Sequence, residues 1–193
     1  MNFLAHLYLS GSSPKTLVGN FIGDFVKGRQ IQQYDPEIAK GIVLHRSIDH
    51  YTDNHPIVSR SKDKLRERYR HYSGVIVDMF YDHFLARNWN DFHDLPLVEF
   101  ADHSYRTIQQ YHDILPEKAK FILPYMIEHN WLVSYARKEG IGGALSGMSR
   151  RTTFESNMEK AIDELNLHYP AFEKEFFAFF PEVEHYAKSF LAS

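Results

Sequence analysis

Apolar residues recur three or four positions apart along nearly the whole chain, which is the spacing of one face of an α-helix. The segment that opens with Ser13-Pro14, a capping residue followed by a proline, carries Leu17 and Phe21 on such a face. No stretch alternates apolar and polar residues as a half-buried strand would. The pattern predicts an all-α helical bundle. We expect helices over residues 14–27, 36–53, 62–70, 75–89, 96–111, 116–137 with a kink at Pro124, 153–169 and 170–191.

Ionisable side chains interrupt the apolar faces of three of these helices. Asp24 continues the face of the first helix, and His45 and Asp49 continue an isoleucine stripe on the second. Asp78 and Asp82 lie among apolar neighbours on a third. Residues four apart on a helix point to the same side, and ionised carboxylates are rarely buried without a partner. The pattern therefore predicts a metal site inside the bundle.

A solvent-facing arrangement of the same acids is the alternative. Asp49 and Asp82 would then lie at the surface, with Arg46 or His83 as their partners. A single acid on a helix favours this interpretation, whereas the occurrence of several acids on three apolar faces favours a shared cation.

Composition limits the kind of metal site. With 193 residues, 44% hydrophobic and 15% aromatic, the chain can bury the core of a single domain spanning residues 1–193. It has no cysteine, which excludes disulfides, thiolate metal sites and cysteine nucleophiles. Histidine and carboxylate ligands suit Mn, Fe or Mg better than a structural zinc site. The formal net charge of −3 argues against general nucleic-acid binding.

The N-terminal segment, residues 1–9, is apolar but lacks a basic region and is interrupted by His6. No later apolar run reaches membrane-spanning length. We therefore expect a cytoplasmic protein that does not bind membranes. We interpret His6 first as a hydrogen-bonded core residue and only second as a metal ligand, because a lone histidine on a short apolar segment is more often the former.

Several short motifs follow one another in the first half of the chain. They are Asn2-Phe3-Leu4-Ala5-His6-Leu7, Gly19-Asn20-Phe21-Ile22-Gly23-Asp24-Phe25, His45-Arg46-Ser47-Ile48-Asp49, Thr52-Asp53-Asn54 and Asp78-x-x-x-Asp82-His83-Phe84-Leu85. In the second half, Trp131-Leu132 and Gly147-Met148-Ser149-Arg150-Arg151 follow. In their content and order these motifs make the chain resemble the bacterial acyl carrier protein phosphodiesterase family.

The resemblance implies a metal-dependent hydrolase that removes the 4′-phosphopantetheine arm from holo-acyl carrier protein and returns the apo protein. It also implies an all-helical fold distantly similar to the HD-domain phosphohydrolases, with Mn or Mg as the ion. The chain departs from the HD pattern of adjacent histidine and aspartate, because His45 is followed by Arg46 and the next acid on that face is Asp49.

Residue roles follow from what a phosphodiester requires, namely a cation on the phosphoryl oxygen and a proton for the leaving serine oxygen. The first choices to hold the cation are Asp24, His45, Asp49 and Asp78. We expect His6, Asp53 and Asp82 either to bind a second metal ion or to hold the ligands of the first in position. Arg46 would bind the phosphate, or else form a surface ion pair. His83 would donate the proton, although it should point about 100° away from Asp82 on an ideal helix.

Basic residues gather just after the helix that carries His45. Lys62, Lys64, Arg66 and Arg70 lie within nine residues, and Arg150 belongs to a second basic loop. Because acyl carrier proteins are strongly acidic, we expect these residues to dock the holo-carrier. The alternative is a solvated face whose charges are paired within the protein.

Two other functions stay open at this point. One is a phosphohydrolase that uses the same metal site on nucleotides or another small phosphate ester. The other is a non-enzymatic helical binding protein whose C-terminal phenylalanines, Phe176, Phe177, Phe179 and Phe180, form a partner surface. We interpret these phenylalanines as core residues.

Overall fold

The computed structural model describes residues 1–193 and consists of helices without a single strand, which confirms the all-α prediction. The α-helices are α1 Phe3–Tyr8, α2 Pro14–Ile22, α3 Pro36–Asp53, α4 Pro56–Asp63, α5 Arg66–Tyr69, α6 Ser73–Arg87, α7 Leu97–Gln110, α8 Glu117–Glu128, α9 Trp131–Ser134, α10 Lys138–Ser149, α11 Ala161–Leu167 and α12 Tyr169–Ala192. Short 3₁₀ helices join them: η1 Gly23–Phe25, η2 Gly28–Gln33, η3 Arg70–Tyr72, η4 Trp89–Asp91, η5 His112–Ile114 and η6 Met158–Lys160.

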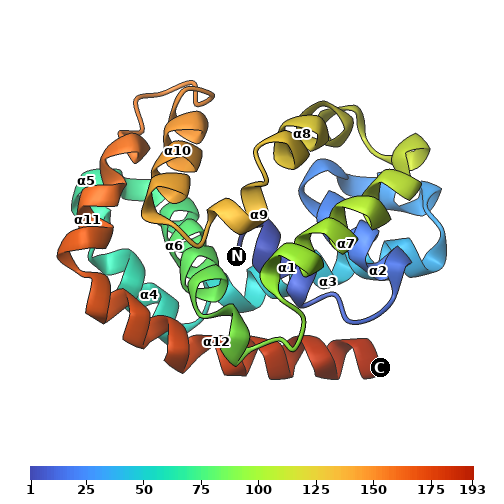
Figure 1. Cartoon of the computed structure of the whole chain (residues 1–193), viewed down its shortest axis with the longest axis horizontal. Coiled ribbons are helices and arrows are strands. Elements are labelled where there is room, and N and C mark those ends of the chain that lie inside the picture. The colour runs from blue at the N-terminus through green and yellow to red at the C-terminus, as the bar shows by residue number, and fades with distance from the viewer.

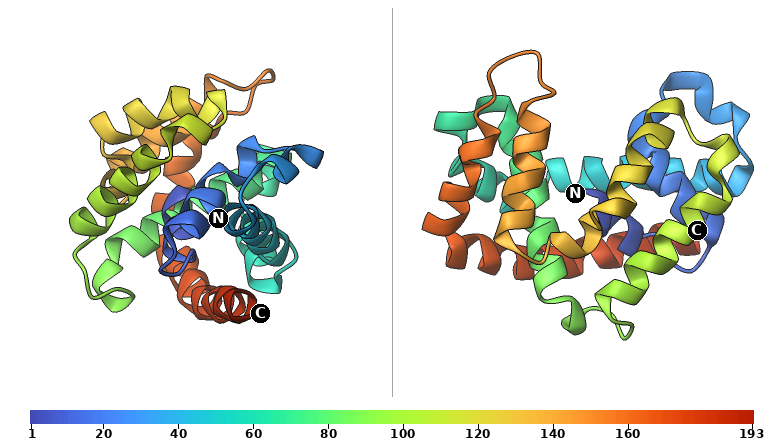
Figure 2. Two further views of the ribbon diagram at one scale, coloured as in Figure 1. Left: turned by 90° about the vertical axis from the view of Figure 1, so that its right-hand side faces the viewer. Right: turned by 45° about the horizontal axis from the view of Figure 1, so that its top comes forward.

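The last helix, α12, runs along one edge of the molecule and packs against α3, α4 and α6 (Figure 1). Its inward face carries Phe176, Phe179 and Phe180, which are buried, so most of the C-terminal aromatic cluster is core as expected. Phe177 is partly exposed. The short α1 lies near the centre of the molecule and contacts both α2 and α6, and the N-terminus lies beside it in every view (Figures 1 and 2).

The closest helix pair in the fold is α2 with α3. A Cβ atom on Gly19 would lie 2.0 Å from the carbonyl oxygen of Ile38, and one on Gly41 would lie 2.3 Å from that of Thr16. Only glycine fits this approach, because any side chain at either position would overlap backbone atoms. The close contact fixes α3, and with it His45, against α2.

Several helix boundaries differ from the sequence prediction. The first helix ends at Ile22 instead of residue 27, and η1 follows it. The expected helix over residues 62–70 is divided between α4 and α5, and the one over 116–137 is divided between α8 and α9. Asn130, between α8 and α9, has a φ angle of 40°, and Arg70, directly after α5, has one of 48°; a continuing α-helix contains neither. Residues 153–160 precede α11 instead of belonging to it, and α10 was not anticipated because its glycines weaken the apolar pattern.

None of the helices combines the length and the apolar composition needed to cross a lipid bilayer.

Candidate metal centre

Two histidines from different helices meet at one aspartate. His6 on α1 and His45 on α3 stack with 3.9 Å between ring centroids and 17° between ring planes. The Nε2 atom of His6 lies 3.1 Å from Oδ1 of Asp49, and Nε2 of His45 lies 3.2 Å from Oδ2 of the same carboxylate. The donor atoms of these three residues all lie within 4.8 Å of one another. The i, i+4 spacing of His45 and Asp49 on α3 produces this convergence, as the sequence predicted.

Asn20 on α2 holds both rings from behind. Its side-chain oxygen accepts a hydrogen bond from Nδ1 of His6 at 2.9 Å, and its backbone oxygen accepts one from Nδ1 of His45 at 2.8 Å. The Asn20 amide nitrogen donates to the backbone oxygen of His6, which fixes the orientation of the amide. With the Nδ1 atoms donating to Asn20, both Nε2 atoms face Asp49. Metal-binding histidines are typically oriented in this way.

Asp24 approaches the pair from η1. Its Oδ1 atom lies 3.2 Å from Nε2 of His45. Gly23 makes this approach possible, because a Cβ atom there would lie 2.2 Å from Cγ of His45. Asp24 is 72% exposed along its side chain, so the cluster opens to solvent on this side.

The Nε2 atom of His45 is buried and makes no hydrogen bond, although two carboxylate oxygens lie 3.2 Å away. Buried polar atoms without partners are rare in folded proteins. A nitrogen that faces carboxylate oxygens without bonding to them suits a shared cation, so the donor set fits a divalent metal bound through nitrogen and oxygen.

Without a metal, a proton on His45 balances the charge of the cluster. Burial lowers the pKa of His45, but Asp24 and Asp49 outweigh burial and raise this pKa to about 9. Burial and the neighbouring His45 lower the pKa of His6 to about 4, so His6 is neutral at pH 7. Burial would raise the pKa of Asp49, yet the two histidines hold it well below its usual range.

Asp78 belongs to the edge of this cluster. Its carboxylate lies 2.9 Å from the amino group of Met1, and the same amino group lies 3.7 Å from Asp49. Burial raises the pKa of Asp78, and the amino group opposes that shift. Asp78 is therefore linked to the histidine cluster only by the Met1 amino group, which lies between it and Asp49.

Asp82, one turn further along α6, faces the start of α1. Its carboxylate is fully buried and accepts hydrogen bonds from the backbone N–H groups of Asn2, Leu4 and Ala5 at 3.2, 2.8 and 3.3 Å. These groups have no partner inside a helix, so Asp82 supplies the acceptor that the N-terminus of α1 lacks. Burial raises the pKa of Asp82 to about 7. Asp82 thus holds the helix that carries His6.

The remaining candidates lie outside the cluster. The Arg46 guanidinium donates to the backbone oxygen of Val26 at 2.7 Å. Asp53 is exposed and pairs with Lys62 at 2.7 Å. His83 is buried on another side of α6. Its Nδ1 donates to the backbone oxygen of Tyr135 at 2.8 Å, and its Nε2 accepts from the Tyr169 hydroxyl at 3.0 Å.

Most cations of the basic stretch are paired within the protein. Lys64 pairs with Glu175 on α12, and Arg66 pairs with Asp63 at 2.8 Å. Lys62 is taken by Asp53. The guanidinium groups of Arg70 and Arg150 have no carboxylate within 4.0 Å and are exposed.

Sequence reasoning did not select Asn20, the residue that orients both histidines. It stands between Gly19 and Phe21 in a motif quoted for its family resemblance, and a polar residue on a buried helix face was the available signal.

Comparisons with known proteins agree on one family. A family model described as acyl carrier protein phosphodiesterase matches residues 1–183. Curated proteins of that name from Yersinia enterocolitica and Escherichia coli O6:H1 are each 33% identical to this chain over 184 residues, which is 95% of both chains. The protein of that name from Photorhabdus laumondii is 33% identical over 192 residues, covering 98% of this chain and 96% of its own. No solved structure matches, so the likeness to HD-domain proteins stays a prediction.

Proposed function

Because the chain belongs to the acyl carrier protein phosphodiesterase family, we propose that it releases 4′-phosphopantetheine from holo-acyl carrier protein and leaves the apo-carrier. Membership of this family makes the protein a hydrolase that acts on a phosphodiester. The observation that carries the proposal is the convergence of His6, His45 and Asp49 in the part of the chain that the family model covers.

The proposed metal ligands are His6, His45, Asp49 and Asp24. The unpartnered Nε2 of His45 and the Asn20 contacts that orient both rings support this set. Mn or Mg, with Fe as a third choice, suits two imidazole nitrogens and carboxylate oxygens without sulfur. When bound, such an ion would polarise a phosphoryl oxygen and lower the pKa of a water molecule. The distances do not support Asp78 as a ligand, because the amino group of Met1 lies between it and Asp49.

Arg46 is the proposed phosphate contact. It follows His45 directly, is exposed, and uses its guanidinium for only one hydrogen bond within the protein, to Val26. Its other N–H groups are free to donate to phosphate oxygens as charge develops on them. The burial of His83 between Tyr135 and Tyr169 gives no support to its role as proton donor.

Docking of the acidic carrier through Lys62, Lys64, Arg66, Arg70 and Arg150 stays a proposal. The internal pairs of the first three weaken it, although the pair of Arg66 with Asp63 is exposed and can exchange partners at small cost. Arg70 and Arg150 support it best, because their charges are not neutralised by neighbouring acids.

The function is tested by incubating the purified protein with holo-acyl carrier protein and Mn, and reading the carrier by intact-mass spectrometry. We expect the carrier to lose the mass of phosphopantetheine, and the loss to disappear with a chelator or with Asp49→Ala. Free nucleotides serve as competing substrates for the small-ester alternative. An unchanged carrier mass with Mn, Mg and Fe would contradict the proposal, and faster cleavage of nucleotides would favour that alternative.

A further inference from the structure

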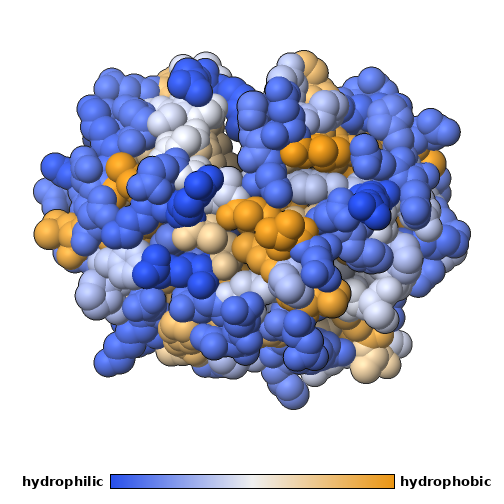
Figure 3. All heavy atoms as spheres, in the orientation of Figure 1, coloured by the Kyte–Doolittle hydropathy of each residue, from blue (hydrophilic) through white to orange (hydrophobic).

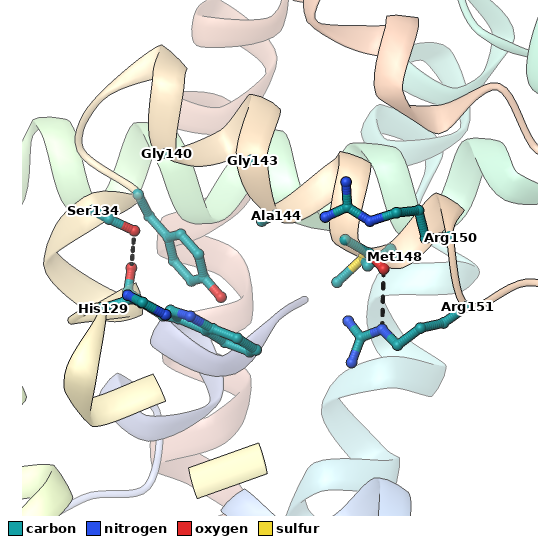
Figure 4. Close-up of a pocket in the computed structure, with 11 residues that line it drawn as sticks. His129, Ser134, Gly140, Gly143, Ala144, Met148, Arg150 and Arg151 are labelled. Carbon is teal, nitrogen blue, oxygen red and sulfur yellow. Dashed lines mark hydrogen bonds between the residues drawn. The ribbon is translucent and has the colours of Figure 1, made fainter. Parts of the chain in front are cut away.

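A cavity of about 390 Å³ lies between α9 and α10, apart from the histidine cluster (Figure 4). Its volume is in the range of small-molecule sites. Trp131 and Tyr135 line it opposite the face of α10 that carries Gly140, Gly143 and Gly147. These glycines are spaced i, i+3, i+7, so they lie on one side of the helix. The cavity is therefore a slot between a glycine-lined face of α10 and a wall of aromatic side chains.

Packing explains only one of these glycines. A Cβ atom on Gly140 would lie 2.1 Å from the backbone oxygen of Ser134, so this position requires glycine. A Cβ atom on Gly143 or Gly147 would meet nothing within 4 Å. Each glycine inside a helix costs about 1 kcal/mol relative to alanine. Gly143 and Gly147 therefore lower the stability of the helix although packing does not require them, and their lack of side chains keeps the slot open.

The aromatic wall offers hydrogen-bond donors. Trp131 and Tyr135 bond the rest of the protein through their backbone oxygens, which accept from Ser134 Oγ and from His83 Nδ1 at 2.8 Å each. Neither the indole N–H of Trp131 nor the phenol O–H of Tyr135 forms a hydrogen bond within the protein, so both are free to donate to a ligand. Both are suited to carbonyl oxygens, which accept hydrogen bonds without carrying a charge.

Two arginines mark one end of the slot. Figure 4 shows Arg150 and Arg151 together at the end of α10, with both guanidinium groups directed toward the cavity. Neither has a carboxylate partner, and Arg151 makes a single hydrogen bond, to the backbone oxygen of Gly147. This end of the slot therefore carries two positive charges that no neighbouring acid neutralises.

The slot and the histidine cluster share a wall. Trp131 contacts Phe3 of α1 with 6.5 Å between ring centroids, and α1 also carries His6. In Figure 3 the surface is indented between α10 and α8, with hydrophobic atoms on the α8 side. A second hollow continues from the first past Phe121, which is 69% exposed, so the slot is open at this end.

We propose that this slot binds the pantetheine arm of the substrate, with its uncharged diamide chain along Gly143 and Gly147, while its phosphate, the group that reacts, stays at the metal centre. The inference rests on the proposed function, because the arm is the part of the holo-carrier with this chemistry. Its two amide carbonyls match the free donors of Trp131 and Tyr135.

Binding is measured first, without catalysis. The protein has two tryptophans, and the other one, Trp89, is 3% exposed and donates to the backbone oxygen of Leu95. Trp131 fluorescence therefore reports ligands in the slot. Titration with pantetheine and with 4′-phosphopantetheine should give saturable changes. Gly143→Leu, whose side chain would fill the slot, should raise both dissociation constants at least tenfold.

Kinetics with the Mn-loaded enzyme then separate the slot from the metal centre. Gly143→Leu should lower kcat/KM for the holo-carrier at least tenfold, whereas its affinity for Mn should equal that of the wild type. The matched pair Gly143→Ala and Gly142→Ala controls for helix propensity, since a Cβ on Gly142 makes only an ordinary 3.9 Å contact with Ile162.

A folded Gly143→Leu protein that binds pantetheine and cleaves the holo-carrier like the wild type would overturn the slot proposal while the proposed function stood. A wild-type protein that binds pantetheine in the slot but never cleaves the carrier would overturn the function alone. Should Gly143→Leu fail to fold, Gly147→Leu applies the same test one turn along α10.

Discussion

His6 and His45 stack face to face at 3.9 Å, and one carboxylate, that of Asp49, lies within 3.2 Å of both. Two protonated imidazoles could not be held so close in a buried site, because their charges would repel each other. The contrast between a pKa of about 9 for His45 and about 4 for His6 expresses this: the pair holds one proton at pH 7. At pH 7 the histidine pair therefore presents one positive charge to the carboxylates, whereas a bound divalent ion would present two.

Replacing Asp49 should separate metal binding from folding. Asp49→Asn removes the charge that both histidines face, so added Mn should no longer raise Tm, whereas it should raise that of the wild type by several degrees. Activity should fall at least 100-fold. Differential scanning fluorimetry of chelator-treated protein measures the first effect. Asp102→Asn, at an exposed ion pair on α7, is the control and should respond to Mn like the wild type.

The metal-free protein should lose stability as the pH rises from 6.5 to 9. The folded-state pKa of His45 is about 9, above the ordinary 6.5, so the folded protein holds a proton that the unfolded chain releases. The contribution is complete below pH 6.5 and is lost through pH 9, by about 3 kcal/mol. The raised pKa of the Met1 amino group acts in the same direction near the upper end. Urea unfolding across this range measures the slope, and His45→Asn should flatten it.

The same proton competes with the metal. Mn binding at pH 7.5 should release close to one proton per site, because a histidine binds metal through its unprotonated nitrogen. Isothermal titration in two buffers of different ionisation enthalpy counts the released protons. Metal affinity should increase with pH up to about 9. Binding without proton release would argue against His45 as a ligand.

Gly23 should be essential to the metal site without touching the ion. Its φ of −51° suits any residue, so an alanine there would be unfavourable for steric reasons alone. Because its Cβ atom would lie 2.2 Å from His45 Cγ, Gly23→Ala should displace the imidazole and weaken Mn binding about tenfold or more. Gly74→Ala, whose Cβ would meet only the end of Lys62 at 3.7 Å, is the matched control. Equal Mn affinities for the two variants would contradict this account.

Replacing Asp82 should lower the free energy of unfolding directly and should weaken metal binding only indirectly. Asp82→Ala leaves three buried N–H groups at the start of α1 without an acceptor and should lower the free energy of unfolding by about 3 kcal/mol. Asp82→Asn keeps one acceptor oxygen and should cost less. Mn affinity should fall in parallel, since α1 carries His6. A large loss of activity in Asp82→Asn with unchanged stability and Mn affinity would instead indicate direct participation in the reaction.

Charge reversal tests the docking surface. Arg70→Glu with Arg66→Glu should raise KM for the holo-carrier about tenfold at low salt, and the difference from wild type should shrink as ionic strength rises. Arg106→Glu, which alters a comparable exposed pair on α7, is the control. If the double variant keeps the wild-type KM and salt dependence, the basic stretch does not dock the carrier.

Helical periodicity predicted only part of the histidine–carboxylate cluster. Asp24, His45 and Asp49 meet because their spacing places them on inward faces. Periodicity could not place His6 beside His45, because α1 is too short to show a period and its partner lies on another helix. The position of Asp82 on an apolar face did indicate burial, but helical spacing along α6 cannot show that its partners are the backbone groups of α1.

Ion pairs between residues that are far apart in the sequence were also difficult to predict. The sequence left open whether the basic stretch is paired within the protein, because two of the acids that pair with it, Glu175 and Glu164, lie about a hundred residues further along the chain. The slot beside α10 could not be predicted for a different reason. Glycine gives no hydrophobic signal, so the sequence predicts no helix over residues 138–149, which form one side of the cavity.

The anchoring of α1 by Asp82 also orders events during synthesis of the chain. A nascent chain that has emerged as far as the end of α3 already contains both histidines and Asp49, but not the acceptor that fixes the first helix. Until α6 is complete, α1 lacks the acceptor for its first backbone N–H groups, and His6 is held only by its contacts with α2 and α3. The contact that anchors α1 joins residues 78 positions apart, so it can form only after most of the first half of the chain has been made.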